Sequence, residues 1–189
     1  MYRIKQITQI AHLLTAPVIN KGDYAVDATA GNGYDTLFLA ENVGIDGHVY
    51  AFDVQEEALN TTFDKLKKES LEKRVSLHLT GHENLSEHVR EQVSIVMYNL
   101  GYLPGGNHNI TTYYQTTLES IKQALTLVGP GGLISIVLYP GHHQGAVEKE
   151  NLLPYLENLP ASEYAVAYYR MTDQQHAPPE LAIVQRNLF

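Results

Sequence analysis

The chain has no cysteine among its 189 residues, and this absence removes several kinds of chemistry. No disulfide, thiol nucleophile or cysteine zinc site can form. Basic residues are also scarce, since 13 Lys and Arg stand against 21 Asp and Glu and leave a formal net charge of −8. Affinity for phosphate groups comes largely from Lys and Arg, so the composition argues against non-specific binding of nucleic acids.

Long apolar runs are absent as well. The first six residues lack the apolar stretch of a signal peptide, and no segment approaches the length of a membrane span. The remaining composition, 44% hydrophobic and 18% charged, is typical of a globular domain of ordinary size. We therefore expect one soluble cytoplasmic domain over residues 1–189, without membrane contact.

One basic segment stands out, from Lys65 to Arg74, with five Lys or Arg in ten residues. We favour a solvated helix surface whose opposite charges pair at i,i+4 spacing. The alternative is a local basic face for a nucleic acid, which a negative net charge of the whole chain does not exclude.

Hydrophobic spacing predicts the order of helices and strands. Apolar residues recur at helical intervals from Ile7 to Val18, which predicts an amphipathic leading helix over residues 1–20 that breaks near Pro17. Strand-like and helix-like segments then alternate, and the last two form a hairpin-like pair. Such a series predicts an α/β fold with a mostly parallel seven-stranded sheet and helices on both faces. The strands are expected at 24–28, 48–53, 75–79, 94–100, 133–139, 164–170 and 181–186, and the helices at 34–42, 56–68, shortly after 83, 112–127 (with 128–132 as its stop) and 146–156.

The segment from Ala25 to Thr36 is the most informative part of the chain. A short apolar strand runs into a turn with Gly31 and Gly33, where the backbone can approach a ligand closely, and a helix then opens. About twenty residues later the next strand ends at Asp53, a carboxylate placed to accept hydrogen bonds from a ribose diol. The two features together indicate a site for a nucleoside cofactor.

The identity of that cofactor depends on charge. A dinucleotide site would carry G-x-G-x-x-G, but here the third glycine is missing, and Asp27 and Asp35 would repel a pyrophosphate. Carboxylates suit the ammonium and sulfonium groups of S-adenosylmethionine. We therefore expect S-adenosylmethionine, with a dinucleotide or a turn without a ligand as the alternatives.

Ligands of such sheets lie beyond the carboxyl ends of the strands, which marks the residues expected to bind the cofactor. Asp53 would hold the ribose, Gln55 would border the adenine, and His82 or Glu83 would accept from its exocyclic amine. The alternatives are a helix N-cap at Asp53 and a capped turn at Gly81. The expected cofactor-binding residues are Asp27, Thr29, Gly31, Asn32, Gly33, Asp35, Thr36, Asp53, Gln55, His82 and Glu83.

The methyl acceptor is expected beside the segment Asn99 to Gly106, which follows the fourth strand. The Asn99 side-chain carbonyl can accept a hydrogen bond from an amine, and Tyr102 offers a stacking face; the alternative is simply a long loop. His142 and His143 are adjacent, but neighbouring side chains point apart, so we expect a substrate-facing loop there and no metal site. The expected catalytic residues are Asn99, Tyr102 and His142.

With these segments assembled, the chain resembles the YtqB-like, or MnmM, class of S-adenosylmethionine-dependent methyltransferases, long filed as rRNA methylases. The resemblance covers nearly the whole chain, and the segments that carry it are Val26–Ala40, Phe52–Gln55, Gly81–Leu85 and Asn99–Gly106. It implies the Rossmann-like fold of class I methyltransferases. One departure is that Leu100 and Gly101 replace the prolines of the N-P-P-Y form found in many amine methyltransferases.

The resemblance also implies a substrate. MnmM enzymes methylate the exocyclic amine of 5-aminomethyl-2-thiouridine at the tRNA wobble position, so we expect the anticodon stem-loop of tRNA as partner. A methyltransferase for rRNA or a small molecule uses the same cofactor site, and a non-catalytic RNA-binding module is a further alternative. Whether the chain acts as a monomer or a homodimer is left open.

Overall fold

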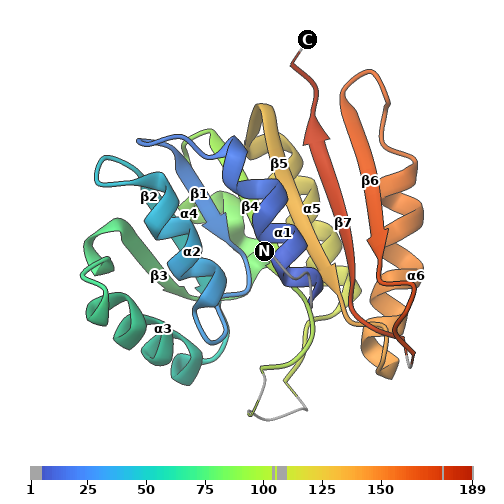
Figure 1. Cartoon of the computed structure of the whole chain (residues 1–189), viewed down its shortest axis with the longest axis horizontal. Helices are drawn as coiled ribbons and strands as arrows, with labels where there is room; N and C mark the ends of the chain where they lie inside the picture. Colours follow the sequence, from blue (N-terminus) through green and yellow to red (C-terminus); the bar gives the residue numbers. More distant parts are fainter. Residues whose placement is uncertain (1–5, 104, 106–109, 176, 189) are drawn as a thin grey trace.

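The computed structural model describes residues 6–103, 105, 110–175 and 177–188, and its helices and strands alternate along most of the chain (Figure 1). The strands are β1 (Tyr24–Asp27), β2 (His48–Asp53), β3 (Val75–Leu79), β4 (Val93–Asn99), β5 (Val128–Leu138), β6 (Tyr164–Arg170) and β7 (Glu180–Arg186). The α-helices are α1 (Ile7–Thr15), α2 (Tyr34–Val43), α3 (Glu56–Lys68), α4 (Leu85–His88), α5 (Tyr114–Leu127) and α6 (His143–Glu157), and the short 3₁₀ turns are η1 (Ala16–Val18), η2 (Glu72–Arg74) and η3 (His82–Asn84).

The seven strands form one sheet in the order β3-β2-β1-β4-β5-β7-β6. β1 to β5 run parallel to one another, whereas β7 is antiparallel to both β5 and β6. The strand order reverses between β1 and β4, which is where ligands of such sheets bind. The predicted α/β sheet with a closing antiparallel pair is confirmed.

Helices cover both faces of the sheet, in two apolar layers. On the face turned to the viewer in Figure 1, α1 and α2 lie over the central strands, and their buried side chains include Ala11 and Leu39. On the other face, α4, α5 and α6 pack through residues such as Leu85, Ile121 and Leu152. The strands alternate their side chains between these layers, so both faces of the sheet are buried at the centre.

Predicted and observed boundaries agree closely for β2, α3 and β3, and differ most at β5. This strand begins at Val128, within the 128–132 segment expected only to stop the preceding helix. The pairing shifts between Val93↔Val128 and Ile95↔Leu133, so extra residues on β5 bulge out of the ladder. The leading helix covers residues 7–15 of the expected 1–20, and residues 1–5 lie outside the described part.

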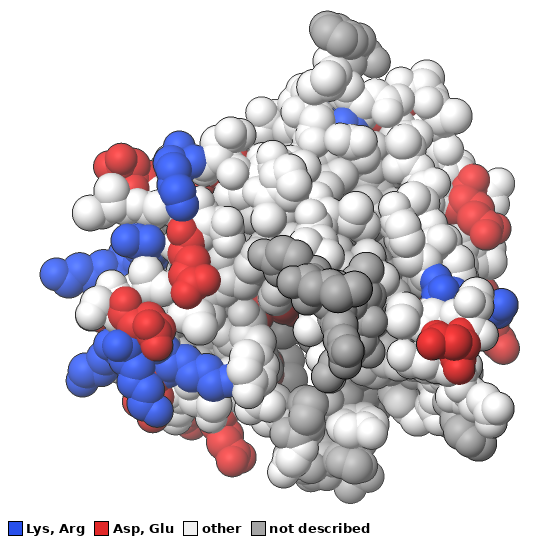
Figure 2. Space-filling view, in the orientation of Figure 1, with Lys and Arg blue, Asp and Glu red and all other residues white. Residues whose placement is uncertain are grey.

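Charge is unevenly distributed over the face shown in Figure 2. Lys and Arg side chains gather at the left of the view, in part over α3, with acidic side chains among them. Within the described residues, no helix is long and apolar enough to cross a membrane.

Candidate active site

A cavity of about 800 Å³ opens at the carboxyl ends of the parallel strands. Its volume is within the usual range for cofactor and drug-sized ligands. The walls combine the glycine turn after β1, the segments after β2 and β3, and the chain leaving β4 and β5. The parallel sheet therefore brings together side chains that are up to about a hundred residues apart in sequence.

The glycine turn is held against α3. Gly33 has a φ of 79°, and a Cβ at that position would lie 2.9 Å from the Thr62 Cα. The Thr62 hydroxyl donates to the Gly31 carbonyl oxygen at 3.1 Å. A side chain at position 33 would therefore be both strained and crowded, and the close packing explains why this turn requires glycine.

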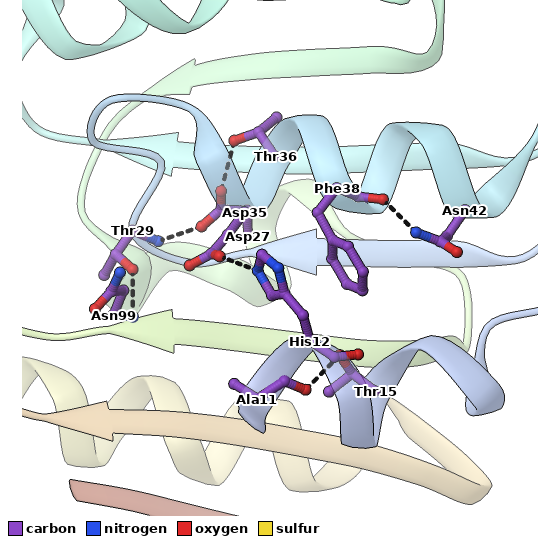
Figure 3. A network of polar contacts seen from close by, with 10 residues as sticks. All are labelled: Ala11, His12, Thr15, Asp27, Thr29, Asp35, Thr36, Phe38, Asn42 and Asn99. Carbon is purple, nitrogen blue, oxygen red and sulfur yellow. Dashed lines mark hydrogen bonds and ion pairs between the residues drawn. The ribbon is translucent and has the colours of Figure 1, made fainter. Parts of the chain in front are cut away.

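Asp27 lies beneath the turn and is fully buried. Its Oδ2 accepts from the Thr36 hydroxyl at 2.5 Å and its Oδ1 accepts from the Thr29 N–H at 3.1 Å (Figure 3). The pKa of Asp27 is raised to about 7, mainly by burial and to a smaller extent by the nearby Asp35 carboxylate. Asp27 is therefore a structural acceptor that organises the turn, and it does not line the cavity.

Asp35 is the acidic side chain of this turn that reaches the cavity. It is 8% exposed and forms part of the cavity wall. Figure 3 shows His12 of α1 and Asp35 of α2 directed toward one another, with the His12 ring beside Phe38. The His12 Nε2 lies 2.6 Å from the Asp35 Oδ1, and the His12 and Phe38 rings stack at 4.0 Å. The leading helix thus supports a residue of the cavity wall.

Asp53, the residue predicted to bind a ribose, lies in the wall of the cavity. Its Oδ2 accepts from the Gly31 N–H at 2.8 Å, and its Oδ1 accepts from the Gln55 N–H at 2.9 Å. Burial raises the pKa of Asp53. Each carboxylate oxygen can accept more than one hydrogen bond, so both can still receive a ribose hydroxyl. Gln55 follows in the same wall, immediately before α3.

His82 and Glu83 both border the cavity beyond β3, but they present different chemistry. The His82 Nδ1 lies 3.2 Å from the Ala28 carbonyl oxygen and its Nε2 lies 3.5 Å from the Thr117 hydroxyl. Burial lowers the pKa of His82, which favours the neutral ring. Both nitrogens face protein atoms, so Glu83 is the better placed acceptor for the exocyclic amine of an adenine.

Asn99, at the end of β4, offers an acceptor inside the cavity. Its N–H donates to the Thr29 hydroxyl at 2.7 Å, which ties β4 to the end of β1. Its Oδ1 is buried and has no hydrogen-bond partner among the described residues. The pKa of Tyr139 is raised to about 12, mainly by burial and to a smaller extent by Asp35, although a hydrogen bond from the Asn99 side chain acts to lower it. That bond uses the Asn99 amide as donor, which leaves its carbonyl oxygen for a ligand.

The turn after Asn99 is connected to a buried acid, Glu148, by hydrogen bonds through Thr112. Gly101 adopts a φ of 118° and donates its N–H to the Thr112 hydroxyl at 2.8 Å. Thr112 in turn donates to the Glu148 Oε2 at 2.8 Å, and Thr117 donates to the Oε1 at 2.8 Å. Glu148 is 1% exposed, and burial raises its pKa. Through these bonds α6 holds the residues that follow β4, from Asn99 to Leu103, here called the acceptor segment.

His142 is the N-cap residue of α6 and lies beside this turn, 5.4 Å from the Tyr102 ring measured between ring centroids. Its Nδ1 accepts from the Gly145 N–H at 3.2 Å, so a neutral ring carries its proton on Nε2. The Nε2 is buried and has no partner among the described residues. With this tautomer, His142 presents an N–H donor to the cavity.

Eleven of the fourteen predicted site residues line the cavity, and three do not. Asp27, Gly33 and Thr36 lie behind the wall and shape it. The roles assigned to all fourteen residues remain predictions. The described residues contain no group of three or more His, Asp or Glu side chains placed to hold a metal ion.

The sequence interpretation overlooked several residues of the site. His12 lies on a helix 23 residues before Asp35, and its pairing with that residue leaves no local signal in the sequence. Glu148 did leave one: it falls on the buried face of α6, four residues before Leu152, where an acid requires partners. Tyr34 and Tyr139 both line the cavity, but they had no assigned role.

The chain matches known proteins over most of its length. The family model described as "Putative rRNA methylase" matches residues 49–185. A curated relative from Arabidopsis thaliana, named "tRNA (mnm(5)s(2)U34)-methyltransferase, chloroplastic", is 41% identical over 184 residues, which cover 92% of this chain and 67% of the relative.

Solved structures agree with this assignment. A crystal structure of a "putative rRNA-methylase" from Clostridium thermocellum has a TM-score of 0.95 and 37% sequence identity. The match covers 98% of this chain and 100% of that protein's chain. A "putative methyltransferase" from Streptococcus mutans in complex with SAH has a TM-score of 0.89 and 35% identity, covering 97% and 99%. The chain belongs to this rRNA methylase family of S-adenosylmethionine-dependent methyltransferases, the family also called YtqB-like or MnmM.

Proposed function

We propose that this methyltransferase transfers a methyl group to the amine of 5-aminomethyl-2-thiouridine at the wobble position of tRNA. The observation that carries the proposal is the unpartnered Oδ1 of Asn99, buried in the wall of the cavity beyond the glycine turn. A primary amine has N–H groups to donate to such an oxygen. The name of the Arabidopsis relative supports this class of substrate.

The cavity fits S-adenosylmethionine in volume and in its polar groups. In this reading, Asp53 receives the ribose hydroxyls, Glu83 faces the adenine, and Asp35 provides negative charge for the ammonium group. When bound, S-adenosylmethionine supplies an electrophilic methyl group on its sulfonium.

The work left to the protein is to present the acceptor amine. An alkyl amine in water has a pKa of ~10.4, as lysine does, and must lose its proton before it can attack. Enclosure in an apolar cavity beside a cation lowers that pKa. The Asn99 Oδ1 can then accept one N–H and direct the nitrogen lone pair toward the methyl group, and the amine releases a proton after transfer.

A strong general base is not required for this chemistry. Tyr139 keeps its proton because burial raises its pKa to about 12, and His142 offers an N–H to the cavity. These groups can position the substrate, for example through its uracil carbonyl oxygens. Orientation of two reactants contributes several kcal/mol toward a reaction barrier.

Asn99→Ala tests the assigned role. We expect turnover to fall about 100-fold, because the amine loses its orienting acceptor, while the affinity for S-adenosylmethionine stays within about twofold of the wild type. Single-turnover methylation and calorimetry with the cofactor measure the two quantities. Equal loss of both would show that Asn99 supports cofactor binding instead.

The substrate itself is tested by nucleoside mass spectrometry of tRNA from cells that lack the gene. Accumulation of 5-aminomethyl-2-thiouridine, reversed by the wild type but not by Asp53→Ala, is the expected result. An unchanged tRNA profile would move the acceptor to rRNA or to a small molecule. A cytoplasmic location and the anticodon stem-loop as binding partner remain predictions, and a homodimer remains one of two alternatives.

A further inference from the structure

The basic segment from Lys65 to Arg74 has no part in the proposed chemistry, yet it begins beside the cavity. The Lys65 Nζ lies 3.3 Å from the centroid of the Tyr34 ring. Tyr34 is 69% exposed and lines the cavity. α3 also packs directly on the glycine turn through Thr62. The basic surface therefore continues outward from the cavity wall.

Three lysines of this segment project into solvent. Lys67, Lys68 and Lys73 are exposed, and none has an ion pair within the part of the chain that the structure describes. Arg74 differs, because it donates to the Ala40 carbonyl oxygen and holds α2. In Figure 2 basic side chains gather in part over α3.

Most basic residues elsewhere in the described part of the chain form ion pairs or hydrogen bonds within the protein. Lys122 and Lys149 pair with glutamates, and Lys21 and Arg186 donate to backbone carbonyl oxygens. Arg170 has no such partner among the described residues, but it lies on β6, at the opposite edge of the sheet from α3. The free positive charge next to the cavity is therefore concentrated on α3 and η2.

The helix dipole offers a simpler explanation for part of this pattern. Glu56 and Glu57 lie in the first turn of α3 and three lysines lie in its last turn, as the dipole favours. The dipole accounts neither for Lys65 over the Tyr34 ring at the cavity nor for Lys73, which lies beyond the helix in η2.

We propose that Tyr34, Lys65, Lys67, Lys68 and Lys73, here called the α3 edge, bind the RNA strand next to the nucleotide held in the cavity. Lysines neutralise the phosphates of that strand, and the exposed Tyr34 ring stacks on an unpaired base. The inference builds on the proposed function, which supplies an unpaired loop nucleotide as substrate. It explains how a chain with a net charge of −8 can hold a polyanion locally.

The test compares two charge-matched double variants. Lys67→Gln/Lys68→Gln removes two positive charges from the α3 edge, whereas Arg90→Gln/Lys122→Gln removes two exposed positive charges from the opposite face of the sheet. Fluorescence anisotropy measures the Kd for an anticodon stem-loop at several salt concentrations. Methylation of the same RNA and of the free nucleoside is measured in parallel.

We expect the α3-edge variant to bind the stem-loop roughly tenfold more weakly at low salt, and the salt slope of log Kd to shrink by about one to two. The control variant should match the wild type, and nucleoside methylation should be the same in all three proteins. Tyr34→Ala should weaken binding further than Tyr34→Phe, because phenylalanine keeps the stacking face.

The outcomes separate the two proposals. Equal stem-loop binding by wild type and α3-edge variant, or equal weakening by the control, would overturn the α3 edge even if the stem-loop is methylated. Binding that depends on the α3 edge without any methylation of the aminomethyl group would support the edge and overturn the proposed substrate.

Discussion

At the residue scale, Asp27 shows how far burial can change an acid. Its carboxylate is fully enclosed at the end of β1 and accepts hydrogen bonds from Thr29 and Thr36. The neighbouring Asp35 faces the cavity and pairs with His12. The two acids that flank the glycine turn therefore have different tasks: Asp27 organises the backbone and Asp35 supplies charge to the cavity.

The raised pKa of Asp27 has a consequence for stability. A carboxyl with a pKa of about 7 in the folded chain and 3.8 as its ordinary value binds its proton more tightly when folded. Its contribution to stability is therefore greatest below about pH 4 and is lost as the pH rises through 7. We expect the wild type to lose stability relative to Asp27→Asn as the pH rises. The free energy of unfolding of the variant minus that of the wild type should therefore increase by a few kcal/mol from pH 4 to 8. Urea unfolding at several pH values measures it, and a difference that does not increase would mean that Asp27 is already ionised at low pH.

At the element scale, α6 is more than a cover for the sheet. Its N-cap residue, His142, lies beside the Tyr102 ring, and Glu148 further along the helix accepts from Thr112 and Thr117. Thr112 holds the Gly101 N–H, so the position of α6 determines the turn that follows Asn99. A helix on one face of the sheet thus controls the geometry of the acceptor segment.

Glu148→Gln tests this control. The amide keeps one acceptor but replaces the other with a donor, so one threonine loses its partner and the Gly101 turn loosens. We expect kcat to fall by roughly tenfold and the free energy of unfolding to fall by about 1–3 kcal/mol, with the KM for S-adenosylmethionine little changed. Glu150→Gln, an exposed position on the same helix, is the matched control. A similar loss in both variants would show that the effect belongs to the helix charge and not to the buried contacts.

At the scale of the whole molecule, the sheet order places the cavity. The order reverses between β1 and β4, so the chain leaving these strands diverges and opens the space between the glycine turn and the acceptor segment. The cavity is walled by segments from both halves of the chain. A ligand that fills it should therefore stabilise the fold as a unit.

Thermal unfolding measures that coupling. Ligand at about 100 times its Kd adds roughly 2.7 kcal/mol, which corresponds to a rise in Tm of about 5–10 °C for a chain of this size. We expect this rise with S-adenosylhomocysteine, and a much smaller rise for Asp53→Ala at the same concentration because the ribose loses its acceptor. An equal rise in wild type and variant would argue against ribose binding by Asp53.

The sequence by itself determined the succession of helices and strands, the glycine turn and the acids and amide at the strand ends. Those features follow from local patterns: period-two and period-3.6 spacing, and the backbone freedom of glycine. The positions of Asp53 and Asn99 at the cavity followed from a general property of parallel sheets, whose carboxyl ends share one edge.

Only the tertiary structure decided what these residues touch. The burial of Asp27, the pairing of His12 with Asp35 across 23 residues, the anchoring of the acceptor turn by Glu148 and the donor nitrogen of His142 all depend on contacts between distant segments. A sequence pattern specifies the conformation of a segment, whereas burial, pKa and hydrogen-bond direction depend on the groups that other segments bring to it.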